Sequence, residues 1–400
     1  MLVGWVLLLP TLVLACGEAD RFSLEVIGEE GIPIVEAEEP EAFFQATVDL
    51  TLGVDSGGGP FEFSLVSGVA GDPDGRLIVV DQHWHEVRVF DSDGDFLYRF
   101  GGRGSGPGEL MTPCCPSFGP DGLLWVNDRE NGRYNAYRLK ESTAEFVTTI
   151  RSATGPVVTH ALAFHPDGGV IDIGGFPDGR AGCNRVIRYH LEVGGSTVRR
   201  EEIPCAPQDR APTLYGSSSS GFWARATGQT SGFVAIPAYV PHHRIAHSTT
   251  GDWAELVTSD YTVRWYGPDG ALKKVIHSEV EPGPRLTSEQ REFQARMIEQ
   301  RGVAIPGFEP VERLQPLRDL AFDQAGRLWI QHRAREGVSR VDVWGTDGTW
   351  RAQVAWPEGV HLEGAFIQDP LAYAVEGPAH GAIRVVRIQL APVTPGVHDG

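Results

Sequence analysis

A tight turn followed at once by a short apolar strand recurs along this chain, and this repetition constrains the fold more than any other feature. The turns are built on Asp-Gly, Gly or Asp-Pro, and segments rich in Val, Ile, Leu and Trp follow them. The turns end at Gly75, Gly122, Gly168, Gly251, Gly326 and Pro370. Their spacing is about 45 residues, or longer where a unit of that length carries an insertion. Such a period predicts an array of similar small units.

A second turn follows the first inside several units. Asp93-Gly94, Asp269-Gly270 and Asp347-Gly348 each come about 20 residues after the first turn, with an alternating strand such as Val87–Phe90 between the two. Each unit is therefore expected to hold four short antiparallel strands, which is the composition of a propeller blade. We predict an all-β fold: a six-bladed β-propeller of four-stranded antiparallel blades over residues 45–391.

The ring also needs a closing strand. The sixth unit reaches its third strand at Ile383–Ile388, and Pro392 and Pro395 then interrupt any further ladder. Ala46–Leu52 precedes the first unit and alternates polar with apolar residues. We expect this N-terminal strand to pair with the last unit and remove both exposed edges.

The first residues indicate export. Leu2–Ala15 is an apolar run, too short to span a bilayer but of the length found in signal peptides. Its end, Val13-Leu14-Ala15-Cys16, resembles the bacterial lipobox, in which the cysteine is lipidated. We predict a lipoprotein signal peptide at 1–15, a lipid anchor on Cys16, an acidic tether at 16–44 and a C-terminal tail at 392–400. The expected location is the bacterial cell envelope, facing the periplasm or on the cell surface. The alternative is an ordinary signal peptide or a buried strand. One feature departs from the signal pattern, because no Lys or Arg precedes the apolar run.

Charge and cysteine content add two expectations. The chain has 34 basic and 53 acidic residues, for a net charge of −19, and such a surface repels phosphate backbones, so we expect no nucleic-acid partner. An exported protein with several cysteines favours disulfides. Cys183 and Cys205 flank one predicted pair of strands and are expected to bond. Cys114 and Cys115 are neighbours, for which a bond is rare.

One stretch resembles a known repeat. Asp81–Asp91, followed by Asp93–Leu97, resembles an NHL repeat. Gly101–Leu110 resembles the segment between blades of bacterial six-bladed propeller lipoproteins related to TolB-like and NHL propellers. The resemblance implies the fold but no reaction. His85 falls where the repeat keeps a structural histidine, whereas Trp84 and Glu86 depart from its usual Asn and Arg.

The links between units suggest where function lies. The Asp-Gly turns on one face are short, while the opposite face carries the long links Gly101–Pro116, Gly174–Arg185, Pro204–Arg244 and His277–Pro316. Binding residues in such scaffolds concentrate on elaborated loops. The loop-face binding candidates are His83, Trp84, His85, Arg103, Arg129, Glu130, His160, His242, His243, Arg244, His332 and Arg333.

No catalytic motif stands out, so we expect a binding or scaffolding module for a peptide, glycan or protein, monomeric and without cofactor or metal. The alternative is a propeller enzyme of lactonase or lyase type with a metal in the central funnel. That alternative needs three or four Asp, Asn, Glu or His side chains from different blades. His83 and His85 could begin such a site, but the inner strands offer few polar residues beyond His160, Arg318 and Asp319.

The segment Thr287–Arg301 predicts an inserted surface helix that begins with a capping box from Thr287 to Gln290.

Overall fold

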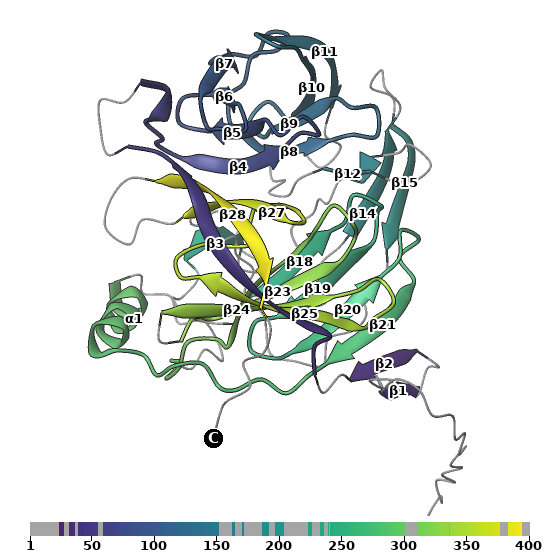
Figure 1. Cartoon of the computed structure of the whole chain (residues 1–400), viewed down its shortest axis with the longest axis vertical. Coiled ribbons are helices and arrows are strands. Elements are labelled where there is room, and N and C mark those ends of the chain that lie inside the picture. The colour runs from purple at the N-terminus through teal and green to yellow at the C-terminus, as the bar shows by residue number, and fades with distance from the viewer. Residues whose placement is uncertain are drawn as a thin grey trace, which may run out of the picture.

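The computed structural model shows a chain built of β-strands, with one α-helix among the described residues (Figure 1). The residues described are 24–27, 32–36, 39–54, 59–151, 162–164, 170–171, 186–191, 197–203, 223–225, 233–235, 239, 241–300, 310–335, 337–376 and 383–393. Among them, no helix is long and apolar enough to cross a membrane. Cys16, His160, Cys183 and Cys205 lie outside these residues, so the anchor and the bond between Cys183 and Cys205 stay predictions.

The first two units are antiparallel meanders of four strands each. The first sheet has the order β4-β5-β6-β7, and the second has the order β8-β9-β10-β11. Glycines with positive φ end the turns Asp72–Gly75 and Asp91–Gly94, a conformation that glycine adopts without steric cost. The strands are β4 (Val66–Gly71), β5 (Leu77–Asp81), β6 (Glu86–Phe90), β7 (Phe96–Gly101), β8 (Pro113–Phe118), β9 (Leu124–Asp128), β10 (Arg133–Leu139) and β11 (Ala144–Arg151).

The middle of the chain contributes three described strand pairs. β12 pairs with β13, β14 with β15, and β16 with β17, all antiparallel. In Figure 1, β14 and β15 lie beside the sheet β18–β21, on the right of the view. The strands are β12 (Ala163–Phe164), β13 (Val170–Ile171), β14 (Val186–Leu191), β15 (Thr197–Ile203), β16 (Trp223–Arg225) and β17 (Phe233–Ala235).

The next meander carries two extra strands from the N-terminus. β18 (His243–His247), β19 (Trp253–Val257), β20 (Thr262–Tyr266) and β21 (Leu272–His277) pair in order, and β2 then adds to β21 in parallel. β1 (Leu24–Ile27) forms a hairpin with β2 (Pro33–Glu36). Residues 16–44, expected to be a tether, therefore include strands of this sheet. Val35 of β2 is buried in the hydrophobic core of the meander.

A single strand joins the last two units. β22 (Leu317–Phe322), β23 (Leu328–His332), β24 (Val338–Trp344) and β25 (Trp350–Pro357) form one meander, and β26 (Phe366–Gln368), β27 (Leu371–Glu376) and β28 (Arg384–Pro392) follow. β3 (Ala42–Leu52) pairs antiparallel with β28 and, at its start, parallel with β25. The resulting sheet has eight strands. The expected pairing of the N-terminal strand with the last unit is present, with Val48 opposite Ile388.

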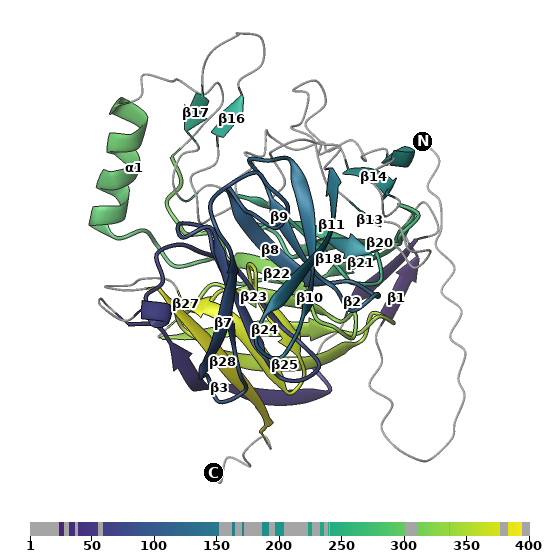
Figure 2. The ribbon, with the colours of Figure 1, turned by 90° about the horizontal axis from the view of Figure 1, so that it is seen from above.

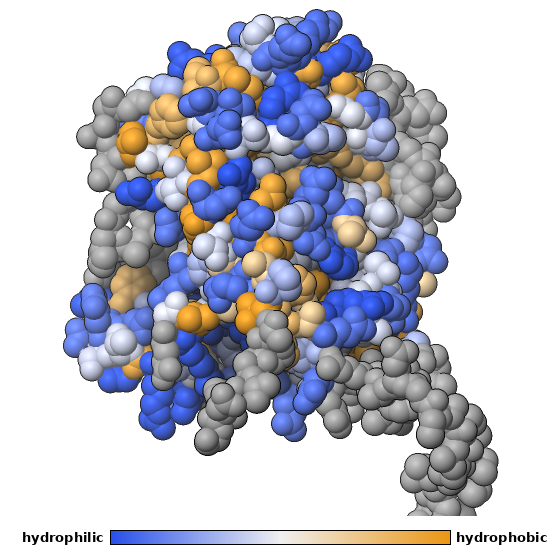
Figure 3. All heavy atoms as spheres, viewed as in Figure 1, coloured by the Kyte–Doolittle hydropathy of each residue, from blue (hydrophilic) through white to orange (hydrophobic). Residues whose placement is uncertain are grey.

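The first strands of different units lie next to one another. β4 contacts both β8 and β26, and β18 contacts β22. The sheets thus share an axis lined by their first strands, as in a propeller. Large side chains fill the layers between sheets: Trp265 of β20 meets Phe322 of β22 edge-on, with ring centroids 5.0 Å apart. On the face shown in Figure 3, apolar residues are interspersed with many hydrophilic ones.

Cys114 and Cys115 differ from the expectation, because a disulfide joins these neighbours. The β8–β9 pairing is irregular between Cys114 and Ser117, and Cys115 has φ 57°. Gly68 of β4 packs directly against this irregular stretch: a Cβ there would lie 2.6 Å from Pro116 Cδ. The bonded pair therefore lies where the first strands of two units meet.

The helix prediction is confirmed. α1 (Ser288–Gln300) lies between β21 and β22 in sequence and at the periphery of the sheets (Figure 2). Its capping box is formed: Thr287 N donates to Gln290 Oε1 at 2.9 Å, and Gln290 N donates to Thr287 Oγ1 at 3.2 Å.

Candidate binding site on the loop face

Carboxylates at strand ends fix the links of one face of the sheets. We call this the loop face, because the links between units and the turns β5–β6, β9–β10 and β23–β24 lie on it. Asp81 accepts hydrogen bonds from the backbone N–H of Ser64 at 3.0 Å and of Leu65 at 3.2 Å. Asp128, at the same place in the next unit, accepts from Met111 at 2.8 Å and Thr112 at 3.1 Å. In these two units the second strand thus anchors the chain that enters the first strand.

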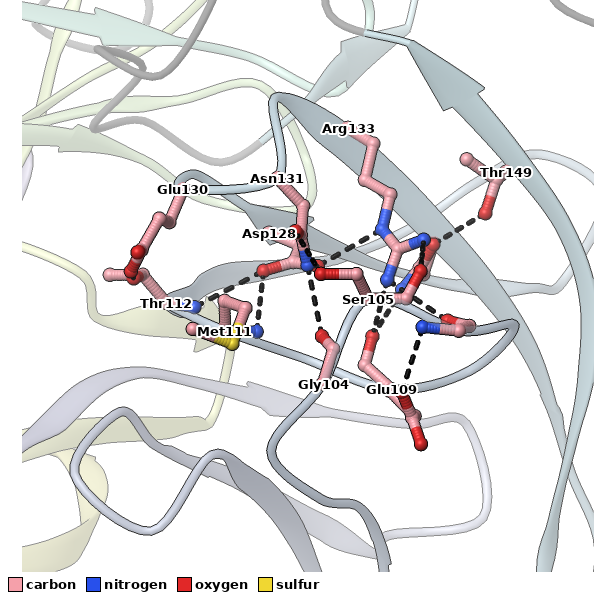
Figure 4. A network of polar contacts seen from close by, with 12 residues as sticks. Gly104, Ser105, Glu109, Met111, Thr112, Asp128, Glu130, Asn131, Arg133 and Thr149 are labelled. Atoms are coloured by element: carbon pink, nitrogen blue, oxygen red, sulfur yellow. Dashed lines mark hydrogen bonds and ion pairs between the residues drawn. The ribbon is translucent and has the colours of Figure 1, made fainter.

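The glycine-rich link before β8 is held by Arg133, as Figure 4 shows. The Arg133 guanidinium donates to Asp128 Oδ2 at 3.0 Å and to the carbonyl oxygens of Ser105, Gly106 and Glu109 at 2.8–3.0 Å. Asn131 donates to Gly104 O and to Asp128 in the same network. This arrangement makes the link between the first two units structural.

His83, Trp84 and His85 lie in the β5–β6 turn. His83 and Trp84 are exposed, and their rings meet edge-on with centroids 5.2 Å apart. His85 has φ 57°, and its Nδ1 lies 2.5 Å from Met111 O, at the entry to the next unit. His85 therefore tethers one unit to the next, whereas His83 and Trp84 face solvent.

Arg103, Arg129 and Glu130 lie nearby. Arg103 is exposed and forms an isolated bridge with Leu110. Arg129 donates to Gln82 Oε1 of the preceding unit, and burial lowers the pKa of Arg129. Glu130 Oε2 accepts from Thr112 Oγ1 at 3.0 Å. These contacts connect the links, so Arg129 and Glu130 have partners within the protein.

His332 differs from the expectation of a loop-face ligand contact, because its residue is only 8% exposed. His332 Nε2 lies 2.6 Å from Asp342 Oδ2, and Tyr261 OH donates to the same oxygen at 3.0 Å. His332 thus belongs to a buried network between two sheets.

The structure gathers a different set of charged side chains at the start of the first strands. Arg244 is the second residue of β18, Arg318 and Asp319 are the second and third of β22, and Arg333 directly follows β23. The link from β25 to β26 adds His361 and Glu363, and the chain entering β18 adds His242. We call this set the arginine group: His242, Arg244, Arg318, Asp319, Arg333, His361 and Glu363. Their charges act on one another, which shows that they lie close together.

Hydrogen bonds fix several members of the arginine group. Arg318 Nη2 lies 2.6 Å from His361 Nε2. Arg333 donates through Nε to the carbonyl oxygen of Gln315 at 2.9 Å. Asp319 Oδ1 accepts from the backbone N–H of Leu320 at 2.8 Å. Strand β22, the turn after β23 and the link from β25 to β26 therefore contribute positioned side chains to one place.

The pKa values in the arginine group are shifted by burial and by the arginine charges. Burial, with Arg318 and Arg244 beside it, lowers the pKa of Arg333 to about 10. Burial and the neighbouring arginines lower the pKa of His361 to about 4, and burial with Arg244 and Arg333 does the same for His242. Burial raises the pKa of Asp319 to about 7. Both histidines are thus neutral at pH 7, and the positive charge is carried by guanidinium groups.

The arginine group contains part of the predicted set. Of the twelve loop-face candidates, His242, Arg244 and Arg333 belong to it, while His160 is not among the described residues and His243 is placed only as the first residue of β18. Arg318 and Asp319 were recognised as polar residues near the axis but not as binding candidates. His361 and Glu363 were missed, because the link from β25 to β26 is short and carries no motif.

The alternative expected from the sequence, a metal enzyme, needs a different donor set. Within the ranges that the structure covers, no three His, Cys, Asp or Glu side chains gather closely enough to hold a metal ion. The three guanidinium groups of the arginine group bind anions and do not ligate cations.

A comparison with protein families agrees with a propeller. A family model described as a six-bladed beta-propeller matches residues 63–114, which hold the first meander and the start of β8. A search of curated proteins finds no match. The solved structures similar to this chain include a putative exported protein from Bacteroides fragilis, at 11% identity and TM-score 0.49, covering 90% of this chain and 99% of that chain.

Two further similar structures are of enzymes. Virginiamycin B lyase from Staphylococcus aureus shares 8% identity at TM-score 0.38, covering 88% of this chain and 90% of its own. Aldose sugar dehydrogenase from Streptomyces coelicolor, in its PQQ-bound form, shares 13% identity at TM-score 0.40, covering 88% and 100%.

Proposed function

We propose that this protein is an exported, lipid-anchored six-bladed propeller that binds a peptide, glycan or protein partner on its loop face. The observation that carries the proposal is the arginine group, in which Arg244, Arg318 and Arg333 come from different elements and meet at the axis end of the loop face. Binding sites in propellers draw on several units in this way, since the first strands converge there.

The blade count of six rests on the order of the strands. Four complete meanders are β4–β7, β8–β11, β18–β21 and β22–β25, and β26–β28 with β3 form another set of four. β12–β15 lie between the second and third of these meanders in sequence and supply the strands of the remaining blade. Export and the anchor rest on the apolar run ending at Cys16.

A binding screen followed by mapping tests the function. The mature chain would be screened by thermal shift against panels of glycans and peptides, and each ligand that stabilises it would then be mapped by hydrogen exchange. We expect protection at residues 331–335 and 361–365, with little change in the turn Asp91–Gly94 on the opposite face. Protection confined to the opposite face, or no stabilisation by any member of the panels, would contradict the proposal.

A further inference from the structure

The arginine group is a region of positive charge in an acidic protein. The chain carries a net charge of −19, yet three arginines lie together with two carboxyl groups and two neutral histidines. Like charges brought together in a partly buried place cost free energy unless an opposite charge compensates them.

Arg318 and Arg333 differ from the structural arginines of this protein. Arg76, Arg133 and Arg327 each bind a carboxylate of their own unit, at 2.6 Å, 3.0 Å and 2.6 Å. Among the described residues, neither Arg318 nor Arg333 forms an ion pair with a carboxylate. Their positive charges therefore lack the close partner that arginines elsewhere in the sheets have.

The two guanidinium groups are held in place while part of each stays available. Arg333 is fixed through its Nε to Gln315 O and through its backbone N–H to Pro316 O, at 2.9 Å and 2.8 Å. Arg318 is fixed through Nη2 to His361. Arg318 and Arg333 are both half-buried, so part of each side chain reaches solvent. A positioned guanidinium with exposed N–H groups matches the paired oxygens of an oxyanion.

We propose that the arginine group binds an oxyanion, a carboxylate, phosphate or sulfate group of the ligand, through the guanidinium N–H donors of Arg318 and Arg333, with Arg244 adding positive charge. This inference rests on the proposed binding function and names the chemistry that the site recognises. Asp319 lies beside the same arginines, so its ionised carboxylate competes with the ligand for them.

Titration calorimetry on the mature chain tests the inference with acetate, inorganic phosphate and sulfate as probes. Arg318→Gln and Arg333→Gln should each weaken the binding of the preferred probe by about tenfold or more, the loss expected for a charge-assisted hydrogen-bonded contact. Arg318→Lys keeps the charge but loses the fork geometry, and we expect it to retain part of the affinity. Asp319→Asn should strengthen binding.

Arg351→Gln is the matched control. Arg351 is partly exposed and pairs with Glu41 at 3.0 Å and with Asp347 in the β24–β25 turn of the opposite face, so its loss removes the same charge away from the site. Binding should be unchanged in this variant. Thermal melts of each variant would show that it is folded.

The three probes identify the source of the oxyanion. Preference for acetate indicates a carboxylate ligand such as an acidic sugar or peptide terminus, and preference for phosphate or sulfate indicates an esterified ligand. Equal binding by wild type, Arg318→Gln and Arg333→Gln would overturn the inference, as would the absence of binding by all three probes. If a neutral glycan protects residues 361–365 with the same affinity in both variants, the binding function stands and the oxyanion inference fails.

Discussion

Arg318 Nη2 donates a hydrogen bond to Nε2 of His361 at 2.6 Å. A guanidinium can only donate, so Nε2 must be unprotonated and the His361 proton resides on Nδ1. The pKa of His361, lowered to about 4 by burial and by the arginines, agrees with a neutral ring at pH 7. His361 thus orients Arg318 without adding a charge.

The raised pKa of Asp319 predicts that the free energy of unfolding depends on pH. Its folded pKa, raised by burial to about 7, lies above the usual value of 3.8, so the folded state binds more protons than the unfolded state between about pH 4 and 7. Stability contributed at this position therefore falls as pH rises through that window. Relative to Asp319→Asn, the wild type should lose about 2–3 kcal/mol between pH 5 and 7, as measured by urea unfolding. Comparing the two proteins cancels the titration of His242 and His361. A constant difference would contradict the raised pKa.

Arg133→Ala should destabilise the protein by about 3 kcal/mol in chemical denaturation, because it leaves Asp128 buried without this partner and releases three carbonyl oxygens. Arg138→Ala is the control: the Arg138 side chain is 57% exposed and lies 4.0 Å from Glu145, so its loss should cost about 0.5 kcal/mol or less. Equal effects of the two substitutions would show that the network around the glycine-rich link contributes nothing.

Gly68→Ala should destabilise the contact between the first two units by about 1–3 kcal/mol. The new Cβ would lie 2.6 Å from Pro116 Cδ and 3.2 Å from Cys115 N. Pro116→Ala removes the closer atom, so the double variant should recover part of the loss in a double-mutant cycle. Additive effects would mean that the two positions do not touch.

Two N-terminal truncations separate the roles of the first strands. Deletion of residues 17–38 removes β1 and β2, including buried Val35, and should lower stability by about 1–2 kcal/mol. Deletion of 17–54 also removes β3 and exposes β25 and β28, so we expect insolubility or a large drop in melting temperature. If both truncated proteins melt like the mature chain, β3 does not close the structure.

Cys16→Ser tests the anchor. The apolar run ending at Cys16 predicts a lipidated cysteine, so the variant should move from the membrane fraction to the soluble fraction of the cells. An unchanged distribution, with the mature chain intact on immunoblots, would show that another feature holds the protein at the membrane.

The strands and their turns could be predicted from the sequence because their signals are local. The turn at Asp91–Gly94 and the alternation of Val87–Phe90 lie within a few residues of each other, and the structure shows the expected hairpin. The closing strand could also be predicted, because the last unit lacks a fourth strand of its own and an N-terminal segment can supply it.

The arginine group could not be predicted in full, because its members occupy unrelated places in the repeat. Arg244 and Arg318 are second residues of first strands, but Arg333 follows a second strand and His361 lies in a link between units. No period connects them, and only the convergence of the sheets brings them together. The disulfide between Cys114 and Cys115 could not be predicted for a different reason. It lies at a local irregularity in β8 that the residue types do not reveal.

The position of β3 sets the order in which the protein can be completed. Asp49 of β3 binds Arg387 of β28 at 2.9 Å across 338 positions of sequence, whereas the meanders pair neighbouring segments. A chain that emerges from the ribosome or crosses a membrane N-terminus first presents β3 long before β25 and β28 exist. Pairing over such a distance is slow, because the closure entropy precedes the contacts. β3 must therefore wait, unpaired, for β25 and β28, and a chain cut short near β28 would leave it a persistent open edge for aggregation.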